Sequence, residues 1–184
     1  YTLSYTLSLH DALPIWARRY ASASRRAMVT TVSVLLETWF GAQADADSII
    51  ACDHNHVASE DHYGQAFRVH RKGALPAEDG QPGVIPGSMG TSSYHVTGRG
   101  CAESLQSSSH GAGRALRRSD AVRRVSRKQL ALQMREVTYD RSIEKRLVEE
   151  APAAYKDIER VMRAQSELTR IVRRVRPVLV YKGI

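Results

Sequence analysis

The sequence predicts an α+β fold in which mixed sheets pack with helices, and three observations support this. Short strand-like stretches and helical patterns follow one another without a regular βαβ alternation, which argues against a doubly wound sheet. The hydrophobic share of 42% is enough for a packed core. The length of 184 residues leaves room for one domain or for part of a larger one.

The first sixteen residues, YTLSYTLSLHDALPIW, differ in character from the rest of the chain. They contain a YTLS repeat but neither a basic n-region nor a small-residue cleavage site, so a signal peptide is a poor interpretation. The string SLHDALPI resembles translated sequencing-adapter DNA. We therefore predict that residues 1–16 are non-native sequence and that the domain comprises residues 17–184. The chain starts without Met, which leads us to expect a fragment.

The first half of the domain is predicted to contain one long helix and several strands. Apolar residues recur at spacings of three and four between Ala17 and Phe40, where Gly41 offers a stop. Ser48 to Val57 is predicted as a strand, with Cys52, His54 and His56 on one face. Short strands are also expected at 67–69, 84–85 and 94–97, separated by a turn-like RKGALPAEDGQPG and by the loop PGSMGTSSY.

The second half is predicted to be mainly helical. Ser107 to Gly113 is expected to be a loop, and a helix should start at Arg114. A second helix over 126–134 can be capped by Ser126, and a third over 153–164 follows Pro152. The closing stretch 168–181 predicts one or two strands interrupted at Pro177.

The charge balance favours polyanionic partners such as RNA, DNA or nucleotides. The formal net charge is +8. Two groups of basic residues stand out. The first comprises Arg114, Arg117, Arg118, Arg123, Arg124, Arg127 and Lys128, and the second Arg170, Arg173, Arg174 and Arg176. Asp120 is the only acidic residue near the first group in the sequence, so its positive charge is largely uncompensated and would attract phosphates. A solvated helix face is the alternative explanation. No apolar run approaches the ~18 residues of a membrane span, and the sparse cysteines, Cys52 and Cys101, fit a reducing cytosol.

Three stretches could carry chemistry. In HGAGR, bare backbone after His110 would let its imidazole approach a phosphorus atom, and Arg114 could take the developing charge. The alternative is a surface turn with an incidental histidine. PGSMGTSS could cradle a phosphate through backbone N–H groups, although it is not a Walker A loop and could be an ordinary turn. CDHNH could chelate zinc or manganese, or be a half-buried strand, since no CxxC or HExxH accompanies it.

Taken together and in this order, the motifs resemble the C-terminal part of the RtcB-type RNA-splicing ligases. The matching pieces span about 17–183 and are HNHV, RKGA, GVIPGSMGTSSY, SSSHGAGR, EEAPAAYKDIERVM and VYKG. The resemblance implies a partial copy of that family's fold. It also implies an enzyme that needs GTP and manganese, two ions in the complete enzyme. Such an enzyme joins RNA 3′-phosphate or 2′,3′-cyclic phosphate ends to 5′-hydroxyl ends.

The resemblance also implies roles for individual residues. His110 should be guanylylated, and His54 should bind manganese and lie near the nucleotide. Further nucleotide contacts are expected from Asn55, Pro86, Gly87, Ser88, Met89, Ser93, Gly111, Ala112 and Gly113, with Tyr155 facing the guanine and Lys182 reading it. Arg114, Lys72 and Arg117 are expected to contact RNA or phosphate. The implied location is cytoplasmic, with an activating protein as a possible partner.

The sequence departs from the family pattern in several places. The family's metal site also uses an Asp, a Cys and two His from an N-terminal half that this chain does not contain. Cys52 and Cys101 match no ligand position, His56 has no matching role, and Ser24 stands where the family usually has Asn. We expect this polypeptide alone not to ligate RNA. Two other functions stay open: a small basic nucleic-acid-binding module without catalysis, and a metal-binding protein that uses Cys52, His54 and His56.

Overall fold

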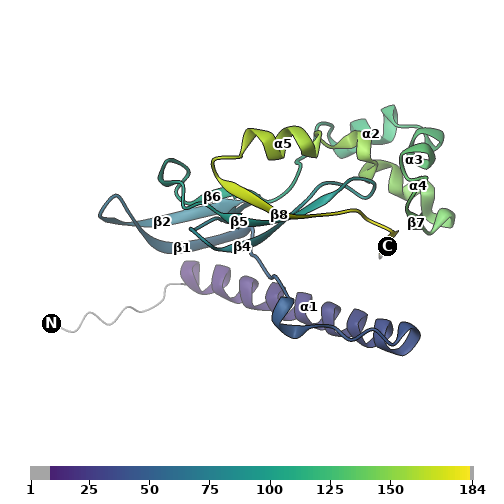
Figure 1. Cartoon of the computed structure of the whole chain (residues 1–184). Coiled ribbons are helices and arrows are strands. Elements are labelled where there is room, and N and C mark those ends of the chain that lie inside the picture. The colour runs from purple at the N-terminus through teal and green to yellow at the C-terminus, as the bar shows by residue number, and fades with distance from the viewer. Residues whose placement is uncertain (1–8, 183–184) are drawn as a thin grey trace.

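The computed structural model describes residues 9–182, and these form the predicted α+β arrangement of small sheets and helices (Figure 1). The YTLS repeat at 1–8 and the last two residues, including the glycine of VYKG, lie outside the described residues. The helices are α1 (Leu9–Phe40), α2 (Arg118–Arg124), α3 (Arg127–Gln133), α4 (Glu144–Leu147) and α5 (Ile158–Ala164). The strands are β1 (Asn55–His62), β2 (Gln65–Lys72), β3 (Ala74–Pro76), β4 (Pro82–Pro86), β5 (Ser93–Gly98), β6 (Ser107–Ser109), β7 (Thr138–Tyr139), β8 (Thr169–Val175) and β9 (Leu179–Val180).

The strands of the described part pair into small, separate sheets. β1 and β2 form an antiparallel hairpin, and β3 pairs antiparallel with β6. β4, β5 and β8 form a three-stranded antiparallel sheet in that order, while β7 and β9 pair parallel. The sheet order brings β8, near the end of the chain, beside β5, next to the loop 86–93.

Two hydrophobic clusters hold the fold together, and the loop 86–93 is anchored in both. One cluster places α5 on the three-stranded sheet: Leu75, Ile85, Tyr94, Val96, Ala112, Ile158 and Met162. The other lies among the short helices: Met89, Val125, Leu130, Met134, Val137, Leu147, Val148 and Ala151. Because the strand ends Ile85 and Tyr94 enter the first cluster and Met89 enters the second, the loop between them is fixed at both its ends and its middle.

Several predicted elements are confirmed. The helix predicted to end at Phe40 does so, and it starts at Leu9 instead of Ala17. The Ser126 side chain accepts a hydrogen bond from the Gln129 N–H and caps α3 as expected. The closing stretch contains β8 and β9, which are separated around Pro177.

Other predicted elements are wrong. The strand predicted over 48–57 begins only at Asn55. Ser48 lies instead in a short 3₁₀ turn, which Asp45 caps by accepting from the Asp47 N–H. His54 and His56 therefore do not share a strand face. The stretches predicted as turn and loop around RKGA and SSSH contain the β3–β6 pair.

The helices after the HGAGR loop also differ from expectation. The helix predicted from Arg114 begins at Arg118, because Arg114 pairs with Tyr155 as an isolated β-bridge. The helix predicted over 153–164 is broken at Tyr155, which is extended. Asp157 then caps α5 by accepting from the Glu159 N–H. The break separates Tyr155 from α5, so its ring lies under Arg114 and its hydroxyl reaches Glu150.

Helix α1 lies beneath the sheets and extends past them (Figure 1). Arg18 and Arg25 both pair with Asp53, just before β1, and so attach the first half of the helix to the body. Within residues 9–182, no helix combines the length and apolar character needed to cross a membrane.

Candidate functional site

His110 follows β6 and is held in one tautomer by the backbone. Its Nδ1 lies 2.8 Å from the carbonyl oxygen of Gly73. A carbonyl oxygen can only accept, so the neutral ring must carry its proton on Nδ1 and its lone pair on Nε2. The residue is half-buried, and its ring stacks on His54 with centroids 4.6 Å apart and an interplanar angle of 8°. The ring therefore presents Nε2 as a nucleophilic atom in a fixed orientation.

Gly73, between β2 and β3, connects the two histidine segments. Its carbonyl also accepts from the His110 N–H, and its own N–H donates to the His54 carbonyl and to the Asn55 side chain. Its φ of +70° lies in the left-handed region that favours glycine. A Cβ there would approach His110 Nδ1 to 3.4 Å. The glycine thus allows the turn and leaves space for the imidazole.

The loop 86–93 lies beside His110 and is a tight, internally bonded turn. The Ala112 N–H donates to the Pro86 carbonyl at 3.0 Å, which ties the HGAGR loop to it. The Thr91 hydroxyl accepts from the Ser88 N–H at 2.7 Å. A Cβ on Gly87 would lie 2.4 Å from the Thr91 Oγ1, so only glycine fits there without movement of the loop.

A second group of predicted residues gathers where Arg114 pairs with Tyr155. The Arg114 guanidinium lies over the Tyr155 ring, 5.0 Å from its centroid. The Tyr155 hydroxyl donates to Glu150, and burial followed by this hydrogen bond raises the pKa of Tyr155. Burial alone would raise the pKa of Glu150, but the Tyr155 hydroxyl and the charges of Lys182, Arg114 and Arg118 lower it. Lys182 is thus close enough for its positive charge to stabilise the Glu150 carboxylate.

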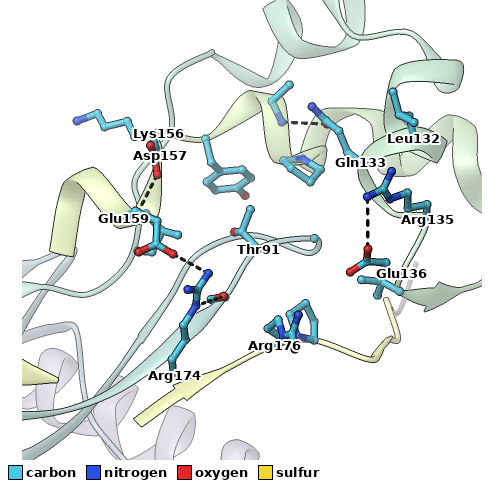
Figure 2. A pocket seen from close by; sticks show the side chains of 18 residues that line it. Thr91, Leu132, Gln133, Arg135, Glu136, Lys156, Asp157, Glu159, Arg174 and Arg176 are labelled. Atoms are coloured by element: carbon cyan, nitrogen blue, oxygen red, sulfur yellow. Dashed lines mark hydrogen bonds and ion pairs between the residues drawn. The ribbon is translucent and has the colours of Figure 1, made fainter. Parts of the chain in front are cut away.

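Tyr155 also lines a cleft of about 660 Å³ beyond the loop 86–93 (Figure 2). Thr91 lies on one side of this cleft, and Figure 2 shows Arg174 directed at Glu159 next to it. A separate cavity of about 580 Å³ lies between α1 and the β1–β2 hairpin and is lined by His54, Asn55 and Lys72. Of the two stacked histidines, His54 thus lines a cavity, whereas the cleft beside Tyr155 is lined by neither of them.

Comparison with known proteins identifies the family. A family model described as "tRNA-splicing ligase RtcB" matches residues 12–183. The chain belongs to this family. It is 40% identical over 173 residues to "RNA-splicing ligase RtcB" of Escherichia coli K12, which covers 91% of the chain and 42% of that relative. It is 39% identical over 153 residues to "tRNA-splicing ligase RtcB" of Nanoarchaeum equitans, covering 71% of the chain and 32% of the relative. The chain thus spans less than half the length of these RtcB relatives.

The site residues expected from the RtcB resemblance lie in two groups in the fold. His54, Asn55, His110, Gly111 and Ala112 lie around Gly73 and the loop that contains Pro86, Gly87, Ser88 and Ser93. Gly113 leads to the second group, since its carbonyl accepts from the Lys156 N–H next to Tyr155. The nucleotide-binding roles of these residues remain predictions.

Other predicted RtcB site residues are placed less favourably. The Met89 side chain is buried in the second cluster, so only its backbone could face a ligand. The Arg114 donors are occupied by Leu116, Glu149, Glu150 and Tyr155, so its phosphate role needs these bonds to change. Lys72 and Arg117 are exposed, and Lys72 lines the cavity beside His54.

The donor chemistry fits manganese only in part. Burial, then the charges of His110 and Arg25, lower the pKa of His54, which favours the neutral imidazole that binds metals. Its neighbour Asp53 is engaged by Arg18 and Arg25. Among residues 9–182, no three His, Cys, Asp or Glu side chains gather as a metal group, and Cys52, His54 and His56 do not form one. The described residues offer one suited ligand and not a complete set.

Sequence reasoning missed Gly73 and Glu150 as parts of the site. Gly73 stood within the RKGA motif, and a glycine directly after a strand can signal a left-handed turn. Glu150 stood within EEAPAAYK, but nothing in the spacing indicated that its carboxylate would meet Tyr155, Arg114 and Lys182. That convergence depends on the β-bridge between Arg114 and Tyr155.

Proposed function

We propose that this chain is part of a GTP- and manganese-dependent RNA ligase that acts through guanylylated His110. The ligase would join a 3′-phosphate or 2′,3′-cyclic phosphate end to a 5′-hydroxyl end, with a cyclic phosphate opened first. RNA is the proposed substrate, the cytoplasm the proposed location, and an activating protein a possible partner. The observation that supports this most strongly is the 2.8 Å contact between His110 Nδ1 and the Gly73 carbonyl oxygen, because this acceptor selects the tautomer whose lone pair is on Nε2.

In the first proposed step, Nε2 of His110 attacks the α-phosphorus of GTP. A P–N bond forms, the bond to the β-phosphate oxygen breaks, and pyrophosphate leaves. The hydrogen bond from Nδ1 to Gly73 stabilises positive charge that develops on the ring. Backbone N–H groups of the loops 86–93 and 110–113 are available to orient phosphate oxygens.

The second group of residues is proposed to hold the guanine. Lys182 would donate to the guanine carbonyl oxygen, and the Glu150 carboxylate could accept from guanine N–H groups. The Tyr155 ring would contact the base beside the cleft, with Arg114 over its ring. The guanylate then passes from His110 to the RNA 3′-phosphate, and the 5′-hydroxyl displaces GMP.

His54 would hold manganese in this proposal. When bound, the metal would neutralise phosphate charge near His110. The described residues supply one suited ligand, and that this chain alone does not ligate RNA stays a prediction. The missing ligands would come from the part of the family's length that the chain does not span.

A chimera tests the proposal. Residues 17–182 of this chain replace the matching region of the E. coli K12 relative, and the protein is incubated with manganese and GTP labelled in its α-phosphate. We expect acid-labile label on the chimera, loss of label in His110→Ala and retention in His95→Ala, since His95 lies in β5 outside the stacked pair. Label that persists in His110→Ala would refute the assignment.

The basic nucleic-acid-binding module remains the second candidate because of the net charge of +8. The same experiment separates the two functions. A folded chimera that binds RNA but takes up no label would favour binding without catalysis.

A further inference from the structure

The strand before His110 has to fix the position of this histidine, because the residue directly after it is Gly111. Glycine adopts a wider range of backbone angles than other residues, so Gly111 constrains its neighbour little. The preceding strand is β6, which pairs with only three residues of β3 in a two-stranded sheet. A two-stranded pair this short holds a strand weakly on its own. The end of β6 next to His110 therefore needs a further anchor.

Gln165, which directly follows α5, supplies such an anchor. Its Oε1 accepts from the Ser109 N–H at 3.1 Å and from the Ser109 hydroxyl at 2.8 Å. An amide nitrogen cannot accept from a backbone N–H, so this contact fixes which end of the Gln165 amide faces Ser109. The residue is 6% exposed, and its Nε2 donates to the Met162 Sδ at 3.3 Å. Both ends of the buried amide are thus engaged, and one of them holds the residue next to His110.

The backbone of Gln165 ends α5 independently of this side chain. Its N–H donates to the Val161 carbonyl at 3.2 Å, and its carbonyl accepts from the Leu168 N–H at 2.9 Å and from the Thr169 N–H at 3.2 Å. These backbone bonds require no particular side chain. A replacement of similar size should therefore leave the end of α5 intact and remove only the bonds to Ser109.

The other end of β6 is held by a different side chain. Arg71, which is buried, donates from its Nε to the Ser107 hydroxyl at 2.9 Å. The middle residue of the strand, Ser108, is also buried, and its hydroxyl has no hydrogen-bond partner among residues 9–182. Arg71 thus fixes the start of β6, and Gln165 fixes the end nearest to His110.

We propose that Gln165 is a positioning residue for His110. By holding Ser109, it sets the position of His110 relative to Gly73, whose carbonyl accepts from the His110 N–H at 3.3 Å and from its Nδ1 at 2.8 Å. If Ser109 moves, both contacts lengthen, and the ring loses the acceptor that selects the Nδ1–H tautomer. The effect on the reaction rests on the proposed function, in which Nε2 of His110 is the attacking atom. The positioning itself involves neither GTP nor metal.

Two replacements of Gln165 separate positioning from stability. Gln165→Met keeps the length of the side chain but leaves the Ser109 N–H without its acceptor, which costs stability. Gln165→Glu keeps an oxygen that can accept from Ser109 in either protonation state, but it buries an acidic group, which also costs stability. Both variants should therefore unfold at lower urea than the unchanged chain. Only Gln165→Met should disturb His110.

The readout is the ring ¹⁵N chemical shifts of His110 in the purified full chain, at about pH 8 where an ordinary histidine is neutral. We expect the unchanged chain and Gln165→Glu to show the proton on Nδ1, and Gln165→Met to shift toward a mixture of tautomers. The matched control is Gln133→Met on α3. Gln133 Oε1 likewise accepts a backbone N–H from a distant segment, that of Ala153, at 3.2 Å. This control should lose stability but keep the His110 shifts of the unchanged chain.

The chimera with the E. coli K12 relative connects the positioning to the reaction. Gln165→Met should take up label on His110 about tenfold or more slowly at unchanged GTP affinity, and Gln165→Glu should retain most of the rate. Unchanged His110 shifts in Gln165→Met, altered shifts in Gln133→Met, or an unchanged labelling rate in Gln165→Met would each overturn the proposal. An unaltered chimera that takes up no label would instead refute the proposed function, and the shifts would still decide whether Gln165 positions His110.

Discussion

The Nδ1–H tautomer of His110 is open to direct test through Gly73. In Gly73→Ala, the new Cβ must occupy a φ of +70° and would contact the imidazole at 3.4 Å from Nδ1 and 3.5 Å from Cε1. These are ordinary contact distances, so the main energetic cost is the left-handed backbone. For an L-residue that conformation costs about 1–2 kcal/mol.

A matched control exists on the same chain. Gly80 also has a left-handed φ, +78°, but nothing lies within 4 Å of its hypothetical Cβ. Gly80→Ala should therefore lose about the same 1–2 kcal/mol of unfolding free energy. With a urea dependence of about 2 kcal/mol per molar, both variants should unfold at roughly 0.5–1 M less urea.

The two variants should differ at the histidine. ¹⁵N chemical shifts of the ring, measured at about pH 8 where an ordinary histidine is neutral, distinguish the protonated from the lone-pair nitrogen. We expect the unchanged chain and Gly80→Ala to show the proton on Nδ1 of His110. Gly73→Ala, which relaxes its strained turn, should shift toward a mixture of tautomers.

One result would refute the reasoning. If His110 of the unchanged chain carries its proton on Nε2, the hydrogen bond to Gly73 does not select the nucleophilic form. The proposed attack by Nε2 would then lose its structural support.

Three further predictions follow from contacts elsewhere in the described part. The pKa of Glu150 is lowered from 4.5 in the fold, so its carboxylate stabilises the folded state above that pH and this contribution disappears in acid. Glu150→Gln should therefore lower the urea midpoint at neutral pH. On acidification, the midpoint of this variant should fall less than that of the unchanged chain; an equal fall in both would contradict this. Asp53→Asn removes the carboxylate that holds α1 and should speed amide hydrogen exchange in the first half of α1. The loss should be only about 1–2 kcal/mol, because the side chains of Arg18 and Arg25 are 52% and 38% exposed and water screens both ion pairs; unchanged exchange there would count against the attachment. Ser126→Ala removes the cap of α3 and should cost about 1 kcal/mol in urea unfolding, whereas Ser126→Asp should retain most of it; a neutral alanine variant would show that the cap contributes nothing.

Several features could be predicted from sequence because their causes are local. The Ser126 cap needs only a hydroxyl before a helix and an N–H three residues later. The helix ending at Phe40 follows from apolar spacing, and the separation of β8 from β9 follows from Pro177. The motifs and their order were sufficient to identify the family, because each motif is a short contiguous stretch that can be recognised without the fold.

Other features depended on contacts between distant segments. The site around His110 is built by a carbonyl from residue 73 and a ring from residue 54, and no local pattern could indicate that they would meet. The β-bridge between Arg114 and Tyr155 overrides the helical tendency of both segments, because the bridge and the bonds to Glu150 exist only in the folded chain.

The amino-acid sequence by itself thus determined the α+β class, the family and the histidine to examine. Only the tertiary structure decided which nitrogen of His110 bonds to Gly73 and that Arg114 is committed to internal bonds. Local hydrogen bonds and side-chain periodicity are encoded within a few residues. Tautomers, ion pairs and exposed faces are set by which segments the folded backbone brings into contact.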